Sequence, residues 1–218
     1  MIGGSSTRNT ATVLEEQAER IERRLAKNPE DENLLLALTR TRLSVGRALV
    51  EVNPETGEET VTPEARAAYE EGLADWKRYR KRAGSEPSVS LAQLVAGTSF
   101  RLAEASFVGI YDIETHIAEA ARAQRIVASQ RPSVGSLTTL AIYEYFDADF
   151  NGGDQATKEA EAKAPSKAEA KNIETQLADY RKRAKKLQKE LRRYAKLESE
   201  RSKQALSSNP FSNLAPTP

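Results

Sequence analysis

Residues 62–76, TPEARAAYEEGLADW, carry the clearest structural signal in the chain. The opening Thr-Pro is typical of a helix start, because proline fits the first helical position and threonine can cap the free backbone amides. Small and aromatic residues then follow at spacings of four, three and four: Ala65, Tyr69, Gly72 and Trp76. This spacing places them on one side of a helix, so the segment predicts an amphipathic helix from Thr62 to about Arg82.

The same helical period recurs along most of the chain. Proline-containing or Asn/Gly-rich breaks divide it, and the segment 52–61, which has turn chemistry, is predicted to be an exposed loop. No strand is predicted, so the fold class is all-α. Helices are expected over about 14–25, 31–46, 62–82, 91–102, 113–129, 134–146 and 155–164, and without a break over 166–204.

The composition offers little catalytic equipment. Of 218 residues, 39% are hydrophobic and 30% are charged, which is typical of a soluble protein with exposed charged helices. There is no cysteine and one histidine, His116, which excludes thiolate zinc sites, cysteine nucleophiles and multi-histidine metal sites. His116 is predicted to be a surface or capping residue. No nucleophile, base and orienting group occur together, so we expect neither an enzyme nor a cofactor.

One short segment is similar to a metal-binding loop. Residues 147–152, DADFNG, match the first half of a calcium loop, in which oxygen ligands alternate before a glycine turn. The twelfth position of such a loop needs a bidentate acid, but here it is Lys158. The segment is therefore predicted to be an Asx-rich turn between two helices, and no metal is expected.

The last predicted helix is strongly basic. Residues 166–205 contain 13 Lys or Arg and 6 Asp or Glu, a net charge of +7, whereas the rest of the chain sums to −6. Apolar residues alternate at spacings of four and three, as in a heptad seam: Ile173, Leu177, Tyr180, Ala184, Leu187, Leu191 and Tyr194. A predicted basic face flanks the seam: Arg181, Lys182, Arg183, Lys185, Lys186, Lys189, Arg192, Arg193 and Lys196.

Two interpretations of this helix remain open. It is a solvated flank whose seam packs on the chain's own helices or on a second copy, or it is a module that binds anionic membrane or nucleic acid. Nucleic acid is the less favoured of these partners. Because clustered positive charges oppose pairing, we expect a monomer at physiological salt with the basic face exposed to solvent.

Three partial repeats are in phase along the chain. Each begins with a similar triplet of positions: Leu35, Leu38 and Thr39, then Leu91, Leu94 and Val95, then Leu137, Leu140 and Ala141. The second helices supply small residues and a tyrosine at the expected spacing: Ala65, Tyr69, Gly72, Ala120 and Ala160. Over about residues 12–165 the chain resembles tetratricopeptide repeat (TPR) proteins. Arg42 and Glu144 stand where the family usually has an aromatic residue.

The resemblance implies an α-solenoid of about three helix pairs followed by the long C-terminal helix. The expected organisation is a flexible linker over 1–11, the repeat domain over 12–165, the basic helix over 166–205 and a disordered tail over 206–218. Packing between helices is expected to bury Leu38, Tyr69, Leu94 and Leu140.

The resemblance also implies a function, that of a noncatalytic scaffold for a protein or peptide partner, possibly an apolar helix. The partner would lie in a groove lined by the first helix of each pair: Asn33, Leu36, Arg40, Ala92, Ala96, Ser99, Thr138, Ile142 and Tyr145. Similar bacterial proteins place a membrane helix and a Gly-rich linker before the repeats. No apolar run here approaches the 18 or so residues that span a bilayer, so the chain as written is expected to be soluble.

Overall fold

Helices make up almost all of the described chain, as predicted. The computed structural model describes residues 4–105 and 110–207. Within them lie the helices α1 (Gly4–Leu25), α2 (Glu32–Ala48), α3 (Pro63–Ala83), α4 (Val89–Glu104), α5 (Ile110–Gln130), α6 (Val134–Phe146), α7 (Phe150–Lys163) and α8 (Lys167–Ser207). Two short strands, β1 (Glu51–Val52) and β2 (Glu59–Thr60), form an antiparallel hairpin between α2 and α3.

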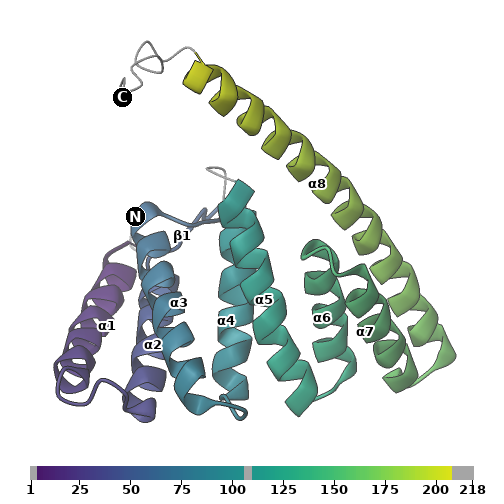
Figure 1. The fold of residues 1–218 in the computed structure, drawn as a ribbon. Coiled ribbons are helices and arrows are strands. Elements are labelled where there is room, and N and C mark those ends of the chain that lie inside the picture. Colours follow the sequence, from purple (N-terminus) through teal and green to yellow (C-terminus); the bar gives the residue numbers. More distant parts are fainter. Residues whose placement is uncertain (1–3, 106–109, 208–218) are drawn as a thin grey trace, which may run out of the picture.

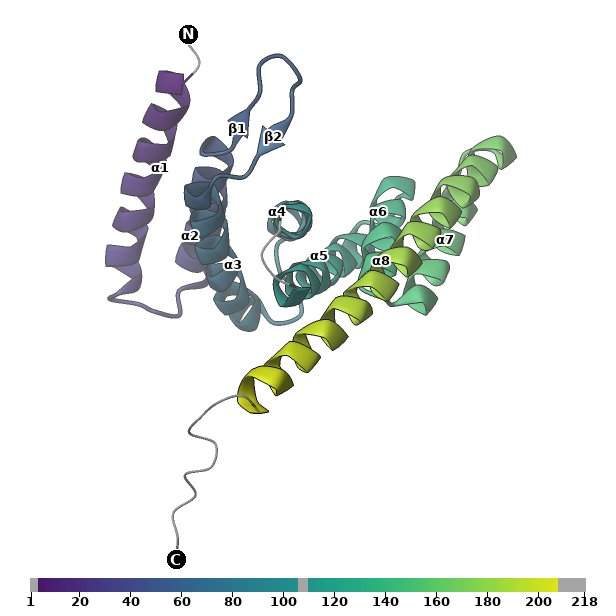
Figure 2. The ribbon, with the colours of Figure 1, turned by 90° about the horizontal axis from the view of Figure 1, so that it is seen from above.

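The helices pack as three pairs that stand side by side in chain order (Figure 1). The pairs are α2 with α3, α4 with α5, and α6 with α7; α1 packs on α2 at one end, and α8 packs on α6 and α7 at the other. Seen from above, the first helices of the pairs lie on one side of the array and the second helices on the other (Figure 2).

Side-chain caps fix where several helices begin. The Thr62 hydroxyl accepts a hydrogen bond from the Ala65 amide at 3.0 Å, as the Thr-Pro pattern predicts. Asp31 and Ser133 accept hydrogen bonds from backbone amides three residues ahead in the same way. Each cap satisfies an amide that the helix leaves free, so these starts are determined locally.

Glycines allow the helices of a pair to approach closely. A Cβ atom added at Gly72 would lie 2.7 Å from Leu43 Cδ2, and one added at Gly46 would overlap the Tyr69 ring. A Cβ atom added at Gly153 on α7 would likewise overlap the Tyr145 ring on α6. Glycines thus allow close approach of the paired helices at two separate pairs.

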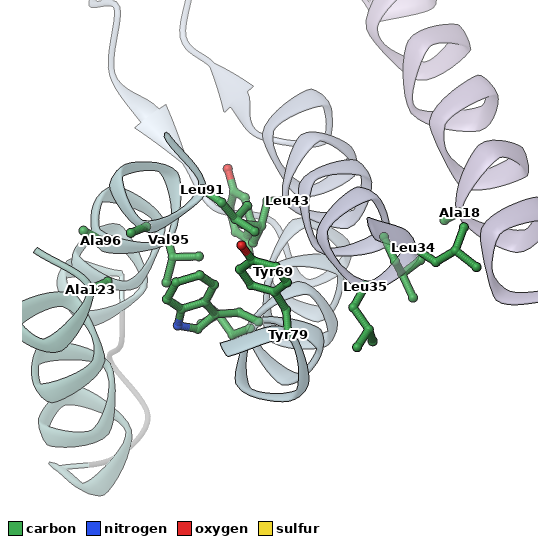
Figure 3. Close-up of a cluster of buried hydrophobic side chains, with 14 of the residues drawn as sticks. Ala18, Leu34, Leu35, Leu43, Tyr69, Tyr79, Leu91, Val95, Ala96 and Ala123 are labelled. Atoms are coloured by element: carbon green, nitrogen blue, oxygen red, sulfur yellow. The ribbon is translucent and has the colours of Figure 1, made fainter. Parts of the chain in front are cut away.

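Two clusters of buried side chains form the core. The first joins α1 to α5 around the fully buried Trp76, and Figure 3 shows Leu43, Tyr69, Leu91 and Val95 converging within it. The second joins the end of α5 to α6, α7 and α8. Each cluster draws side chains from several helices, and α5 contributes residues to both.

Three of the four residues expected in the core are buried, and the fourth is not. Leu38, Tyr69 and Leu140 are buried, but 38% of Leu94 is exposed. The expectation for Leu94 was wrong because α4 packs on α5 and also on α2 and α3, and it presents Leu91, Val95 and the neighbouring alanines to them. Leu94 lies on the remaining side of the helix.

This difference within one helix gives a stability prediction. Leu91→Ala should lower the free energy of unfolding by about 2 to 5 kcal/mol, because Leu91 is fully buried and its loss leaves a cavity. Leu94→Ala should change it by less than about 1 kcal/mol, because that side chain is partly solvated already. Urea denaturation of the two variants measures both values, and equal losses would contradict this description of α4.

Two other predictions need correction. Helix α1 begins at Gly4, inside the segment predicted to be a linker, because its buried stripe starts at Ala11, one heptad before Ala18. The 52–61 segment is exposed as predicted, but its ends form the hairpin, and Gly57 takes a positive φ of 70° at the turn. The predicted tail lies outside the described residues from 208 onward.

Among the described helices, none is both long enough and apolar enough to cross a membrane.

Candidate binding surfaces

The structure divides the predicted groove residues into two groups. Asn33 and Arg40 are exposed, and Leu36, Thr138 and Ile142 are partly exposed. The other four are buried: Ala92, Ala96, Ser99 and Tyr145. A partner cannot reach these four side chains, so their assignment to the groove was wrong. The repeat phase places Ser99 and Tyr145 at the position of Leu43, a core residue, and α4 buries Ala92 and Ala96 because it lies between other helices.

An accessible surface nevertheless lies across α2 and α4. Arg40 Nη2 on α2 donates a hydrogen bond of 3.4 Å to Ser90 Oγ on α4, which places the outward sides of the two helices next to each other. We call this surface the α2–α4 face and define it by six residues: Asn33, Leu36, Arg40, Gln93, Leu94 and Gly97. A Cβ atom added at Gly97 would meet no heavy atom within 4 Å, so the surface is open at that point.

The β-hairpin closes one end of the α2–α4 face. Glu59 on β2 pairs with Arg47 of α2 at 3.0 Å, and its carboxylate also pairs with Arg101 of α4. Arg47 and Arg101 lie seven residues after Arg40 and Leu94, so they belong to the same sides of their helices. Glu59 therefore links the two helices, and the hairpin is an attached element and not a free insertion.

Aromatic side chains extend this surface toward α6. The rings of Phe100 on α4 and Tyr143 on α6 are stacked with centroids 4.6 Å apart, and Phe146 is 5.8 Å from Phe100. Burial, with a smaller effect of the nearby Glu104 carboxylate, raises the pKa of the Tyr143 phenol. Tyr143 thus stays neutral and acts here as an aromatic surface that can donate a hydrogen bond.

The seam of α8 is used within the chain. Ile173, Leu177, Ala184 and Leu191 are buried, and the first three share the second core cluster with residues of α6 and α7. Gln188 Nε2 donates to the Phe146 carbonyl at 2.9 Å, which fixes the middle of α8 on the end of α6. Tyr194, predicted to close the seam, is 58% exposed. The seam therefore packs on the chain's own helices as far as Leu191 and does not occupy the α2–α4 face.

Eight of the nine basic-face residues are exposed. The exception is Arg181, which is partly exposed and forms a bidentate contact with Asp154 on α7 at 2.8 and 2.9 Å. This contact lowers the pKa of the Asp154 carboxyl and raises that of Arg181. Arg181 is therefore part of the attachment of α8, whereas the remaining residues lie at the surface.

The single histidine lies in a buried part of α5. His116 is buried, which corrects the expectation of a surface residue, and burial, followed by the nearby Arg66, lowers its pKa. Its neighbour Glu119 accepts hydrogen bonds from Trp76 Nε1 at 2.8 Å and from Arg122 at 2.6 Å. Charged groups of α3, Arg66 and Glu70 among them, act on the pKa of His116, so its surroundings include a helix that is distant in the sequence.

The segment that is similar to a calcium loop forms the N-terminal cap of α7. Asp149 accepts a hydrogen bond from the Gly152 amide at 2.9 Å and pairs with Arg125 at 3.2 Å, so it caps α7. Across the described residues, no group of three or more His, Asp or Glu side chains is arranged to hold a metal ion.

The surface residues that the sequence did not indicate are Gln93, Leu94, Gly97 and Glu59. Their signal was weak: Leu94 follows the apolar pattern of a core residue, and the acidic hairpin carries no periodic pattern.

Comparison of the chain with protein-family models, with curated proteins and with solved structures finds no significant match.

Proposed function

We propose that the chain is a TPR-like α-solenoid that acts as a noncatalytic scaffold and binds a protein partner on the α2–α4 face. The phased repeats support the solenoid part of the proposal. Leu35, Leu91 and Leu137 occupy equivalent positions in the first helices of the three pairs, and their exposed fractions are 2%, 0% and 2%. Equivalent positions that are buried alike are expected where each pair packs on the next.

The proposal that a partner binds this face rests on the exposure of Leu94. Leu94 is one of five large hydrophobic residues exposed among the described residues, and it lies where two first helices meet. Gly97 follows one turn later on the same helix, and Leu36, Arg40, Asn33 and Gln93 are further accessible residues of the α2–α4 face. An apolar centre with a polar rim is typical of protein interfaces.

The chemistry of the face indicates the kind of segment that would fit it. Leu94 and Leu36 would contact one or two apolar side chains of the partner, and Gly97 would allow its backbone to approach closely. Arg40 is the charged residue among the six that define the face, so it would pair with a carboxylate of the partner. The proposal is therefore an apolar segment, a peptide or a helix, that carries an acidic residue beside its anchor.

A photo-crosslinking experiment in cells of the native host tests this function. A photoreactive phenylalanine analogue placed at Leu94 should give a discrete adduct with a partner protein upon illumination, because Leu94 would lie inside the interface. Val13 on α1, which is 59% exposed and apart from the α2–α4 face, is the matched control position. The adduct should disappear when Arg40→Glu is added.

Two results would contradict the proposal. One is the absence of any adduct from Leu94 although the labelled protein is folded by its helical circular dichroism. The other is the same pattern of adducts from Val13, since that would reflect random collision and not a surface specific to α2 and α4.

A further inference from the structure

The cations of α8 form one continuous stripe. On an ideal helix, eight of the nine basic-face residues fall within an arc of about 140°, and only Arg183 lies outside it. We call these eight the α8 stripe: Arg181, Lys182, Lys185, Lys186, Lys189, Arg192, Arg193 and Lys196. From Arg181 to Lys196 the stripe is about 22 Å long, and the only acid in this part of the helix, Glu190, lies beside it.

Most of the stripe is free of internal ion pairs. Arg181 pairs with Asp154, and Lys196 lies 4.0 Å from Glu200. Among the described residues, no carboxylate lies within ion-pair distance of Lys182, Lys186, Lys189, Arg192 or Arg193. Like charges this close raise one another's free energy, and an anionic partner would relieve that repulsion.

Most of the stripe faces away from the helix pairs, whereas Arg181, which pairs with Asp154 on α7, lies at its inner edge. The buried side of α8, with Ile173, Leu177 and Ala184, faces α6 and α7, and Lys182, Lys186 and Arg193 lie on the other side of the helix. Figure 1 shows α8 along the outer edge of the array, running from beside α7 past the upper ends of α6 and α5. A broad surface could therefore meet most of these cations without meeting the helix pairs first.

A hollow adjoins the stripe on the side of α7. It has a volume of about 240 Å³ and is lined by Phe150, Lys185, Gln188, Lys189 and Arg192. The Lys185 ammonium lies 5.6 Å from the centre of the Phe150 ring. Three cations around a partly apolar floor suit a phosphate group attached to a less polar moiety.

We propose that the α8 stripe binds the surface of an anionic phospholipid bilayer, with a headgroup phosphate in the hollow at Phe150. Lysine and arginine clusters on a helix attract acidic lipids through charge alone. The apolar seam is buried or partly buried as far as Leu191, so α8 would lie on the headgroups and would not insert this part of its seam. Leu197, one turn after Arg193 and 43% exposed, would add an apolar contact near the end of the stripe.

A nucleic acid fits these observations less well. Nucleic-acid-binding domains are broadly basic, but the charge of this chain outside residues 166–205 is −6 and its pI is about 7.9. The stripe also contains no aromatic residue on which bases could stack. The bilayer interaction is independent of the proposed protein partner, because the stripe and the α2–α4 face lie on different helices.

Vesicle co-sedimentation of the full chain tests the proposal. The protein should sediment with phosphatidylcholine vesicles that contain about a third phosphatidylglycerol, and not with phosphatidylcholine alone, because each cation near an anionic surface strengthens binding about fivefold. Lys182→Gln with Lys186→Gln should weaken binding about 30-fold. Binding should also be lost at about 1 M salt, where screening acts within about 3 Å.

The matched control is Lys77→Gln with Lys81→Gln on α3, which removes the same charge from two exposed lysines at the same spacing. The control should bind as the unmodified chain does. Equal losses in both variants, equal binding to neutral vesicles, or tighter binding to duplex DNA than to anionic vesicles at the same salt would each overturn the proposal.

Discussion

Trp76→Ala is expected to lower the free energy of unfolding by about 3 to 5 kcal/mol, one of the largest effects of any single substitution in this chain. Trp76 is fully buried where the first two helix pairs meet, so its removal leaves a large cavity. The substitution also removes the indole N–H that donates a hydrogen bond of 2.8 Å to the Glu119 carboxylate. This buried carboxylate would then keep Arg122 as its remaining partner.

Urea denaturation followed by circular dichroism measures this effect, since Trp76 is the single tryptophan and its fluorescence is lost in the variant. Trp76→Phe separates the two contributions. It keeps most of the ring packing and loses the hydrogen bond, so it should cost about 1 to 3 kcal/mol. A loss below about 1 kcal/mol in Trp76→Ala would show that the two pairs do not share a core at this position.

Arg42→Ala should cost about 3 kcal/mol, because it leaves a buried carboxylate short of a partner. Arg42 pairs across the α2–α3 interface with Asp75, whose side chain is only 3% exposed. Arg78 also contacts Asp75, at 3.1 Å, and therefore limits the loss. The other two acids that Arg42 contacts, Glu22 and Glu71, are largely exposed and should contribute little.

Two variants check the origin of this effect in the same denaturation assay. Arg23→Ala removes an arginine whose ion pair with Glu19 is exposed on both sides, and it should change stability by less than about 0.5 kcal/mol. Arg42→Leu combined with Asp75→Leu removes both charges and should recover most of the loss. If the combined variant were less stable than Arg42→Ala, the unpaired carboxylate would not be the cause.

Arg42 also shows where the chain departs from the TPR pattern that its sequence resembles. At its position and at Glu144 the family usually has an aromatic residue, and here both positions hold ion-pair residues that bridge to another helix. Glu144 is buried and pairs with Arg125 of α5 at 2.8 Å; burial raises the pKa of its carboxyl, and the Arg125 contact partly opposes this. The pattern identified two contact positions between helices but not the chemistry of the contact.

The sequence by itself determined the helices and most of their ends. The periods, the prolines and the caps at Asp31, Thr62 and Ser133 act within a few residues, so local pattern is enough to find them. It also determined the close approach of paired helices at Gly72 and the basic character of α8, because residue size and charge need no tertiary context.

Only the tertiary structure decided which apolar residues remain at the surface. Leu91 and Leu94 look alike in the sequence, yet the neighbours of α4 bury one and leave the other accessible. His116 is buried although it was expected at the surface, and Glu59 joins α2 to α4 across a hairpin that has no helical signal. Burial depends on the sum of all packed neighbours, whereas a periodic pattern records only which side of its own helix a residue occupies.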